Sequence, residues 1–164
     1  MQFENYFFAS IISFLGLVIG FTLIKIAPEE QKPLMKYFSF GKKFFLLLIF
    51  IFLLFYYSYS SSYILGLTIC CLLLLYMEHK MKDLSKKTMI SYIVFGILFF
   101  LSSKNTNLFV FASSLILIYG MFASSMLEMK PKFYEKFLAN NLVFILIANI
   151  LFLSDYHALF LIFR

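Results

Sequence analysis

The chain has 164 residues, of which 63% are hydrophobic and 13% are charged, and its mean hydropathy is +0.93. This composition excludes a water-soluble globular protein, because a core of this size cannot bury so much apolar surface. The net charge of +6 does not indicate a nucleic-acid partner, since the basic residues flank apolar runs and no nucleic-acid-binding motif accompanies them. We therefore expect the lipid bilayer as the solvent, with anionic lipids at the cytoplasmic face as the counter-charge.

Six long apolar runs follow one another along the chain. They predict an all-α, polytopic transmembrane helical bundle, because a barrel strand would alternate apolar and polar residues where these runs are unbroken. Consecutive runs pair as three hairpins in a single transmembrane domain, residues 1–164. The predicted spans cover residues 6–26, 44–57, 63–77, 88–101, 108–127 and 137–153.

The lysines indicate how the chain is threaded through the membrane. Twelve of the thirteen lie in or beside alternate gaps between the apolar runs, and the other gaps hold only Lys104. Short loops that carry Lys or Arg stay on the cytoplasmic side, so this pattern predicts an even number of spans with both termini outside. We expect the membrane to be a prokaryotic cell membrane. The tyrosines agree, since only Tyr92 and Tyr119 of eleven fall well inside a predicted span.

The second, third and fourth runs are shorter than the roughly 20 residues that a hydrocarbon core requires. We expect Lys42, Lys43 and Lys80 to snorkel to the headgroups and lengthen these helices. A re-entrant hairpin of runs two and three is the alternative, because it would leave the charge alternation unchanged. Residues 28–43, whose apolar side chains alternate with lysines, predict an amphipathic cytoplasmic segment in the interface.

Small residues on two runs predict close contacts between helices. Gly16 and Gly20 form a GxxxG motif that Ser13 extends, and the fifth run has a similar set. That second set is Ser113, Gly120 and Ser124. Small residues let two backbones approach closely in lipid, either within the bundle or with a membrane-protein partner or a second copy.

Polar residues inside the bilayer are costly, and the sixth run carries three, Asn140, Asn141 and Asn149. They could line the path of a substrate, or they could form hydrogen bonds between helices, with Asn140 and Asn141 at the cytoplasmic interface. Further along, Asp155 and His157 would lie within the membrane if the sixth helix continued to Phe163, which would favour a proton-coupled role. A span that ends near Leu153 instead leaves an apolar tail.

A cluster on the cytoplasmic side suggests a metal site. His79 and Asp83 are four residues apart, so on one helix they would share a face and could contribute two ligands to a divalent cation. Glu29 and Glu30 would add carboxylates if the loops converged. A solvated, salt-bridged loop explains the same residues without a metal, because lysines surround His79 and Asp83 in the sequence. These are Lys80, Lys82, Lys86 and Lys87.

The segment Ala27–Pro33, with the sequence APEEQKP, follows the first span. It resembles the segment after the first helix of small, uncharacterised multi-pass membrane proteins from archaea. The motif in that family continues with a glycine where this chain has Leu34. The resemblance implies a multi-pass fold and brings no activity with it.

The sequence contains no nucleophile–base pair, phosphate-binding loop, glycine fingerprint or zinc-ligand spacing, and it predicts no cofactor. We interpret the chain as a non-enzymatic subunit or scaffold that packs against other membrane helices. A small permease or carrier component is the second hypothesis. A lipid-headgroup enzyme at the cytoplasmic face is the third, and it requires His79, Asp83 and one of Glu29 or Glu30 to lie together.

Overall fold

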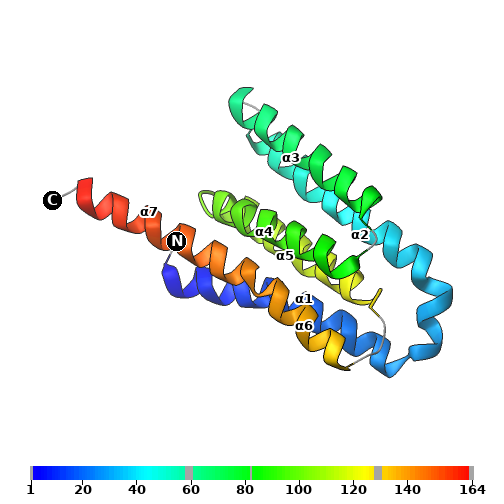
Figure 1. Cartoon of the computed structure of the whole chain (residues 1–164). Coiled ribbons are helices and arrows are strands. Elements are labelled where there is room, and N and C mark those ends of the chain that lie inside the picture. Colours follow the sequence, from blue (N-terminus) through cyan, green and yellow to red (C-terminus); the bar gives the residue numbers. More distant parts are fainter. Residues whose placement is uncertain (1, 58–60, 82, 128–130, 163–164) are drawn as a thin grey trace.

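The computed structural model describes residues 2–57, 61–81, 83–127 and 131–162 (Figure 1). These residues form a helical bundle, which confirms the all-α fold class predicted from the sequence. The helical segments are α1 (Phe3–Ile26), α2 (Pro28–Tyr56), α3 (Ser61–Lys80), α4 (Leu84–Ser102), α5 (Thr106–Ser124), α6 (Pro131–Asn141) and α7 (Val143–Ile162).

The helices are arranged in three layers (Figure 1). α2 and α3 form one outer layer, α4 and α5 lie in the middle, and α1 with α6 and α7 forms the other outer layer. α5 packs most extensively against α1 and α2, while α4 packs against α7. Helices distant in the chain are therefore brought together on both sides of the middle layer.

The connections between helices fall at two ends of the bundle. α1 meets α2, α3 meets α4 and α5 approaches α6 at one end, which we call the lysine end because these gaps carry twelve of the lysines (Figure 1). α1 begins and α7 ends at the other end. The helix directions thus alternate as the lysine pattern predicted.

Within the part of the chain that the structure describes, five helical segments are long and apolar enough to cross a membrane: α1, α2, α4, α5 and the segment Phe133–Asp155 of α6 and α7. The chain is therefore an integral membrane protein. α3 has 20 residues, about the length that spans a hydrocarbon core, and it runs antiparallel beside α2. The three short apolar runs lie within longer helices, because their polar flanks continue the helical backbone.

The predicted interfacial segment 28–43 is not separate from the second span. Both belong to α2, which begins with Pro28 at its first position and acidic residues in its first turn. Figure 1 shows the first turns of α2 at an angle to the rest of the helix. Pro33 lies inside the helix and lacks a backbone N–H, which is a common cause of such a bend. The Gln31 amide anchors these turns by donating to the carbonyl oxygens of Ser125 (3.2 Å) and Leu127 (2.5 Å) beyond α5.

The helix of the sixth span does not end near Leu153, although the apolar spanning segment ends close by, at Asp155. α7 continues to Ile162, since no proline or glycine follows Pro131 to stop it. A single turn residue, Leu142, separates α6 from α7. Asp155 is exposed, and the side chain of His157 lies outside the described residues.

Aromatic rings fill the core between the layers. Tyr92, Phe95 and Phe99 of α4 are fully buried, and Tyr119 of α5 and Phe144 of α7 close around them. Ring centroids lie 4.8 Å apart for Phe95 and Tyr119 and 5.4 Å apart for Phe99 and Phe144, both in edge-to-face geometry. The middle layer is thus locked to its neighbours by interdigitated rings.

Candidate functional site

The structure places the two small-residue stripes against each other, where α1 crosses α5. A Cβ atom on Gly16 would overlap the carbonyl oxygen of Leu117, and one on Gly20 would overlap that of Met121. Glycine is required at both positions because the obstacle is backbone, which cannot rotate away. The glycines of α1 therefore serve a contact within the chain.

Serine hydroxyls bond the same two helices on either side of the glycines. Ser13 Oγ of α1 donates to the Ser113 carbonyl of α5 at 3.2 Å. Ser125 Oγ, directly after α5, lies 2.8 Å from the Met121 carbonyl of its own segment and 3.3 Å from the Gly20 carbonyl of α1. Ser124 instead donates to the Gly120 carbonyl of its own helix at 2.9 Å. These hydrogen bonds satisfy the serine hydroxyl groups, for which the hydrocarbon of the bilayer offers no acceptor.

Gly120 has a different function from the glycines of α1. A Cβ atom there would lie 2.5 Å from the hydroxyl oxygen of Tyr92 and 3.0 Å from the backbone nitrogen of Leu17. The missing side chain makes room for the tyrosine of α4 at the junction of three helices. Sequence reasoning grouped Gly120 with the stripe but missed Leu117 and Met121, because their contribution is backbone carbonyl groups.

Two of the three asparagines, Asn140 and Asn149, bond helices together. Asn140 Nδ2 lies 3.4 Å from Ser85 Oγ at the start of α4, and Asn149 Nδ2 lies 3.3 Å from Ser10 Oγ of α1. Asn141 is fully buried, and its amide donates to the Phe137 carbonyl at 2.7 Å. Their amide groups therefore act within the bundle, although the Oδ1 atoms of Asn141 and Asn149 accept no hydrogen bond from the described residues.

A charge cluster that the sequence did not predict joins three helices at the lysine end. Lys42 Nζ of α2 lies 2.6 Å from Glu78 Oε1 of α3, and the two side chains are 2% and 6% exposed. Lys87 of α4 lies 3.9 Å from Glu78 Oε2 and donates to the Glu78 carbonyl oxygen at 2.9 Å. The two lysines thus share the carboxylate and the C-terminal end of α3, whose dipole favours a cation.

Lys42 does not snorkel, contrary to the expectation from the sequence. It is buried among α2, α3 and α5, with its Nζ 5.9 Å from the ring centroid of Tyr119. Its exposed neighbour Lys43 remains available to the headgroups. The difference arises because consecutive residues of a helix face different directions, and Lys42 shares the buried face.

That buried face is a regular seam between α2 and α3. On α2, Lys42 continues a set of buried residues spaced four, three and four apart, which are Leu46, Ile49 and Leu53. On α3, Glu78 ends a set with the same spacing, which is Leu67, Cys71 and Leu74. Such spacing is typical of knobs-into-holes packing, and the Lys42–Glu78 ion pair joins the two sets at the lysine end.

The proposed metal ligands do not come together as the sequence suggested. α3 ends at Lys80, so His79 and Asp83 do not share a helical face. Asp83 is the N-cap of α4 and accepts from the backbone nitrogen of Ser85 at 3.0 Å. Glu29 and Glu30 are exposed at the start of α2, and among the described residues no group of three metal-ligating side chains gathers.

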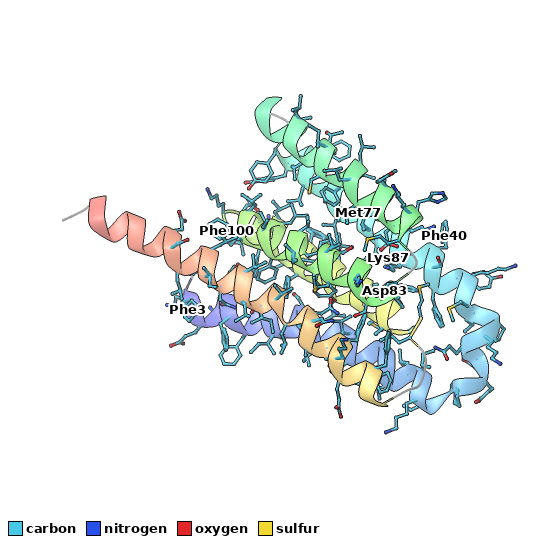
Figure 2. All side chains as sticks on the ribbon, viewed as in Figure 1. Phe3, Phe40, Met77, Asp83, Lys87 and Phe100 are labelled. Atoms are coloured by element: carbon cyan, nitrogen blue, oxygen red, sulfur yellow. The ribbon has the colours of Figure 1, made fainter. Side chains whose placement is uncertain are left out.

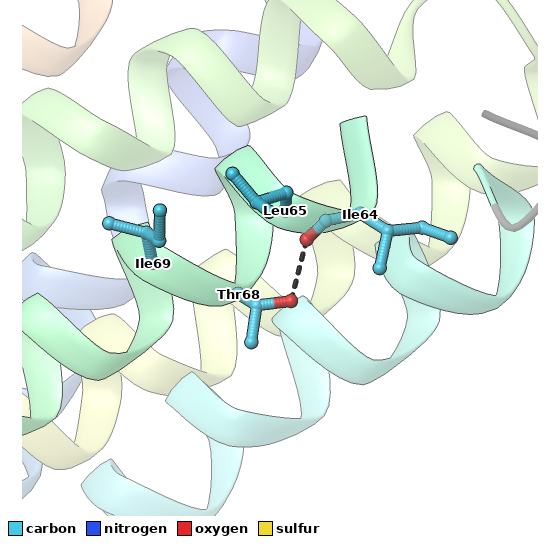
Figure 3. Close-up of a pocket in the computed structure, with 4 residues that line it drawn as sticks. All are labelled: Ile64, Leu65, Thr68 and Ile69. Carbon is cyan, nitrogen blue, oxygen red and sulfur yellow. Dashed lines mark hydrogen bonds between the residues drawn. The ribbon is translucent and has the colours of Figure 1, made fainter. Parts of the chain in front are cut away.

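The outward face of α3 is apolar and unpacked. Leu65, Ile69, Leu72 and Tyr76 repeat the spacing of the buried seam and are each at least half exposed. A shallow depression of about 420 Å³ lies on this face and is lined by Ile64, Leu65, Thr68 and Ile69 (Figure 3). Thr68 donates to the Ile64 carbonyl at 2.6 Å, so the depression offers an apolar wall.

No protein-family model, curated protein sequence or solved structure matches the chain.

Proposed function

We propose that this chain is a non-enzymatic membrane subunit or scaffold that binds a transmembrane helix of a partner along the outward face of α3. Its place would be a prokaryotic cell membrane, with α3 as a sixth crossing and both termini outside. The lysine pattern supports this orientation, and the length of α3 supports the crossing.

Gly66, which is exposed at the edge of this face beside Leu73, is the observation that carries the proposal. Gly16, Gly20, Gly41, Gly96 and Gly120 each lie against a neighbouring helix, whereas no atom of the described residues would contact a Cβ at Gly66. Glycine within a helix costs about 1 kcal/mol relative to alanine, and the packing that offsets this cost elsewhere is missing at Gly66. A partner helix approaching Gly66 would supply that packing.

A bulky substitution tests this directly. We expect Gly66→Leu to leave the isolated chain folded, because the position is open, and to abolish recovery of the partner after mild-detergent extraction. The measurement combines thermal unfolding of the purified chain with chemical crosslinking in the native membrane. A partner retained by Gly66→Leu, or a wild-type chain that remains monodisperse and uncrosslinked, would contradict the proposal.

Leu146 of α7 provides a matched control. It is 60% exposed, close to the 65% of Leu65, but it lies on the opposite outer layer of the bundle. A crosslinkable cysteine at Leu65 should capture the partner, and the same cysteine at Leu146 should not. Equal capture at both positions would indicate non-specific contact.

A carrier component is the second candidate, favoured by the unbonded Oδ1 atoms of Asn141 and Asn149. If these atoms face a hydrated path, single cysteines in place of Asn141 and Asn149 will react with a water-soluble maleimide in intact vesicles. We expect both cysteines to remain unlabelled, because the asparagine amides already bond within the bundle. Labelling of both would favour the carrier over the scaffold.

A further inference from the structure

The bent start of α2 presents two different sides. We call residues 32–45 the elbow. Its inner side is packed on α5, where Phe38 and Phe45 lie 6.4 and 5.4 Å from the Phe122 ring and a Cβ on Gly41 would touch that ring. With the Gln31 bonds described above, these contacts hold the elbow in a fixed orientation.

The outer side of the elbow is aromatic and exposed. Tyr37 and Phe40 are 69% and 70% exposed, and Phe44 is 46% exposed. Spaced three and four residues apart, they share one face of the helix. Figure 2 places Phe40 where α2 bends, at the lysine end of the bundle.

Three lysines accompany this aromatic face. Lys32, Lys36 and Lys43 are all exposed, and their spacing places them together on the adjoining face of the helix. The structure pairs none of these three with a carboxylate among the described residues, in contrast to the buried Lys42. Glu29 and Glu30 lie earlier, in the first turn, where the helix dipole favours acidic residues.

We propose that the elbow is a binding surface for anionic lipid headgroups, with Tyr37 and Phe40 inserted in the interface and the three lysines on lipid phosphates. The charge of the elbow favours a negatively charged leaflet as its partner. The aromatic rings match the apolar layer of that leaflet, and the lysines match its phosphate groups. This surface lies at the end of the bundle and is separate from the outward face of α3.

The absence of tryptophan from the chain allows a direct test. Tyr37→Trp introduces a single fluorescent reporter in the elbow, and the protein is reconstituted in phosphatidylcholine vesicles that contain brominated phosphatidylglycerol or brominated phosphatidylcholine. We expect brominated phosphatidylglycerol to quench the reporter at lower mole fraction. Each of Lys32→Gln, Lys36→Gln and Lys43→Gln should lower that preference up to about fivefold.

Two controls separate the surface from general lipid contact. Phe55 lies on the same helix at the opposite end and is 78% exposed, so the reporter of a Phe55→Trp protein should be quenched equally by both lipids. Lys104→Gln removes a lysine far from the elbow and should leave the preference of the elbow reporter unchanged. Equal quenching of the Tyr37→Trp protein by both lipids, or quenching by neither because protein covers the elbow, would overturn the proposal.

Discussion

Gly16→Ala and Gly20→Ala should each destabilise the protein by about 3 kcal/mol or more, at the upper end of the cost of overpacking. The added methyl group meets a backbone carbonyl of α5 in each case, so α1 must move away and its serine bonds to α5 lengthen. Reversible unfolding in mixed micelles with increasing sodium dodecyl sulfate would measure the free energy change.

Gly66→Ala is the control, because it makes the same chemical change on a helix where no described atom is within reach. It should leave the stability of the isolated chain unchanged or raise it by up to about 1 kcal/mol, the difference in helix propensity. An unfolding transition of Gly16→Ala that coincides with the wild type would show that α1 and α5 do not approach as closely as described.

The second large effect is expected at the charge cluster. Glu78→Leu leaves the ammonium group of Lys42 buried without an anion, and we expect a loss of about 3 to 5 kcal/mol in stability. Lys42→Met should cost less, because Glu78 keeps its contact with Lys87. The double variant Lys42→Met/Glu78→Leu should recover most of the loss, since apolar residues would complete the seam between α2 and α3.

A double-mutant cycle on these variants measures the coupling between the two charges. The unfolding assay used for the glycine variants gives all four free energies. Additive losses in the double variant would mean that the two side chains do not pair in the folded protein. Lys43→Met provides a comparison on the adjacent, exposed lysine and should change stability little.

The fold class, the alternating helix directions and the contact surfaces of α1 and α5 could be predicted from the sequence. Long apolar runs have few alternatives to helices in lipid, and GxxxG permits a backbone approach that other residues block. The partner atoms could not be predicted, because Leu117 and Met121 contribute carbonyl oxygens that every residue possesses.

The charge cluster was missed for a different reason. A lysine at the end of an apolar run has the same sequence context whether it meets headgroups or a neighbouring helix, so Lys42 and Lys43 could not be distinguished by position alone. The spacing of Lys42 from Leu46 and Ile49 was the available signal, since it places the lysine on the buried stripe.

The errors at Asp83 and Leu153 concern the ends of helices. Asp83 precedes Leu84 and Ser85, and an acidic residue in that place commonly caps a new helix, which would have separated it from His79. No helix-breaking residue follows Ser154 and Asp155, so the helix continues past the predicted end of the span at Leu153. An apolar run thus indicates the extent of a span and not the end of its helix.

The order in which the ribosome makes the two halves of the α2–α3 seam has a consequence for biogenesis. Lys42 emerges before Glu78, so α2 meets the translocon with a cation whose counter-ion has yet to be synthesised. In α2 alone, Lys42 can reach the headgroups as Lys43 does, whereas the arrival of α3 supplies the carboxylate beside which Lys42 is buried. Synthesis of α3 is therefore what completes the burial of this cation.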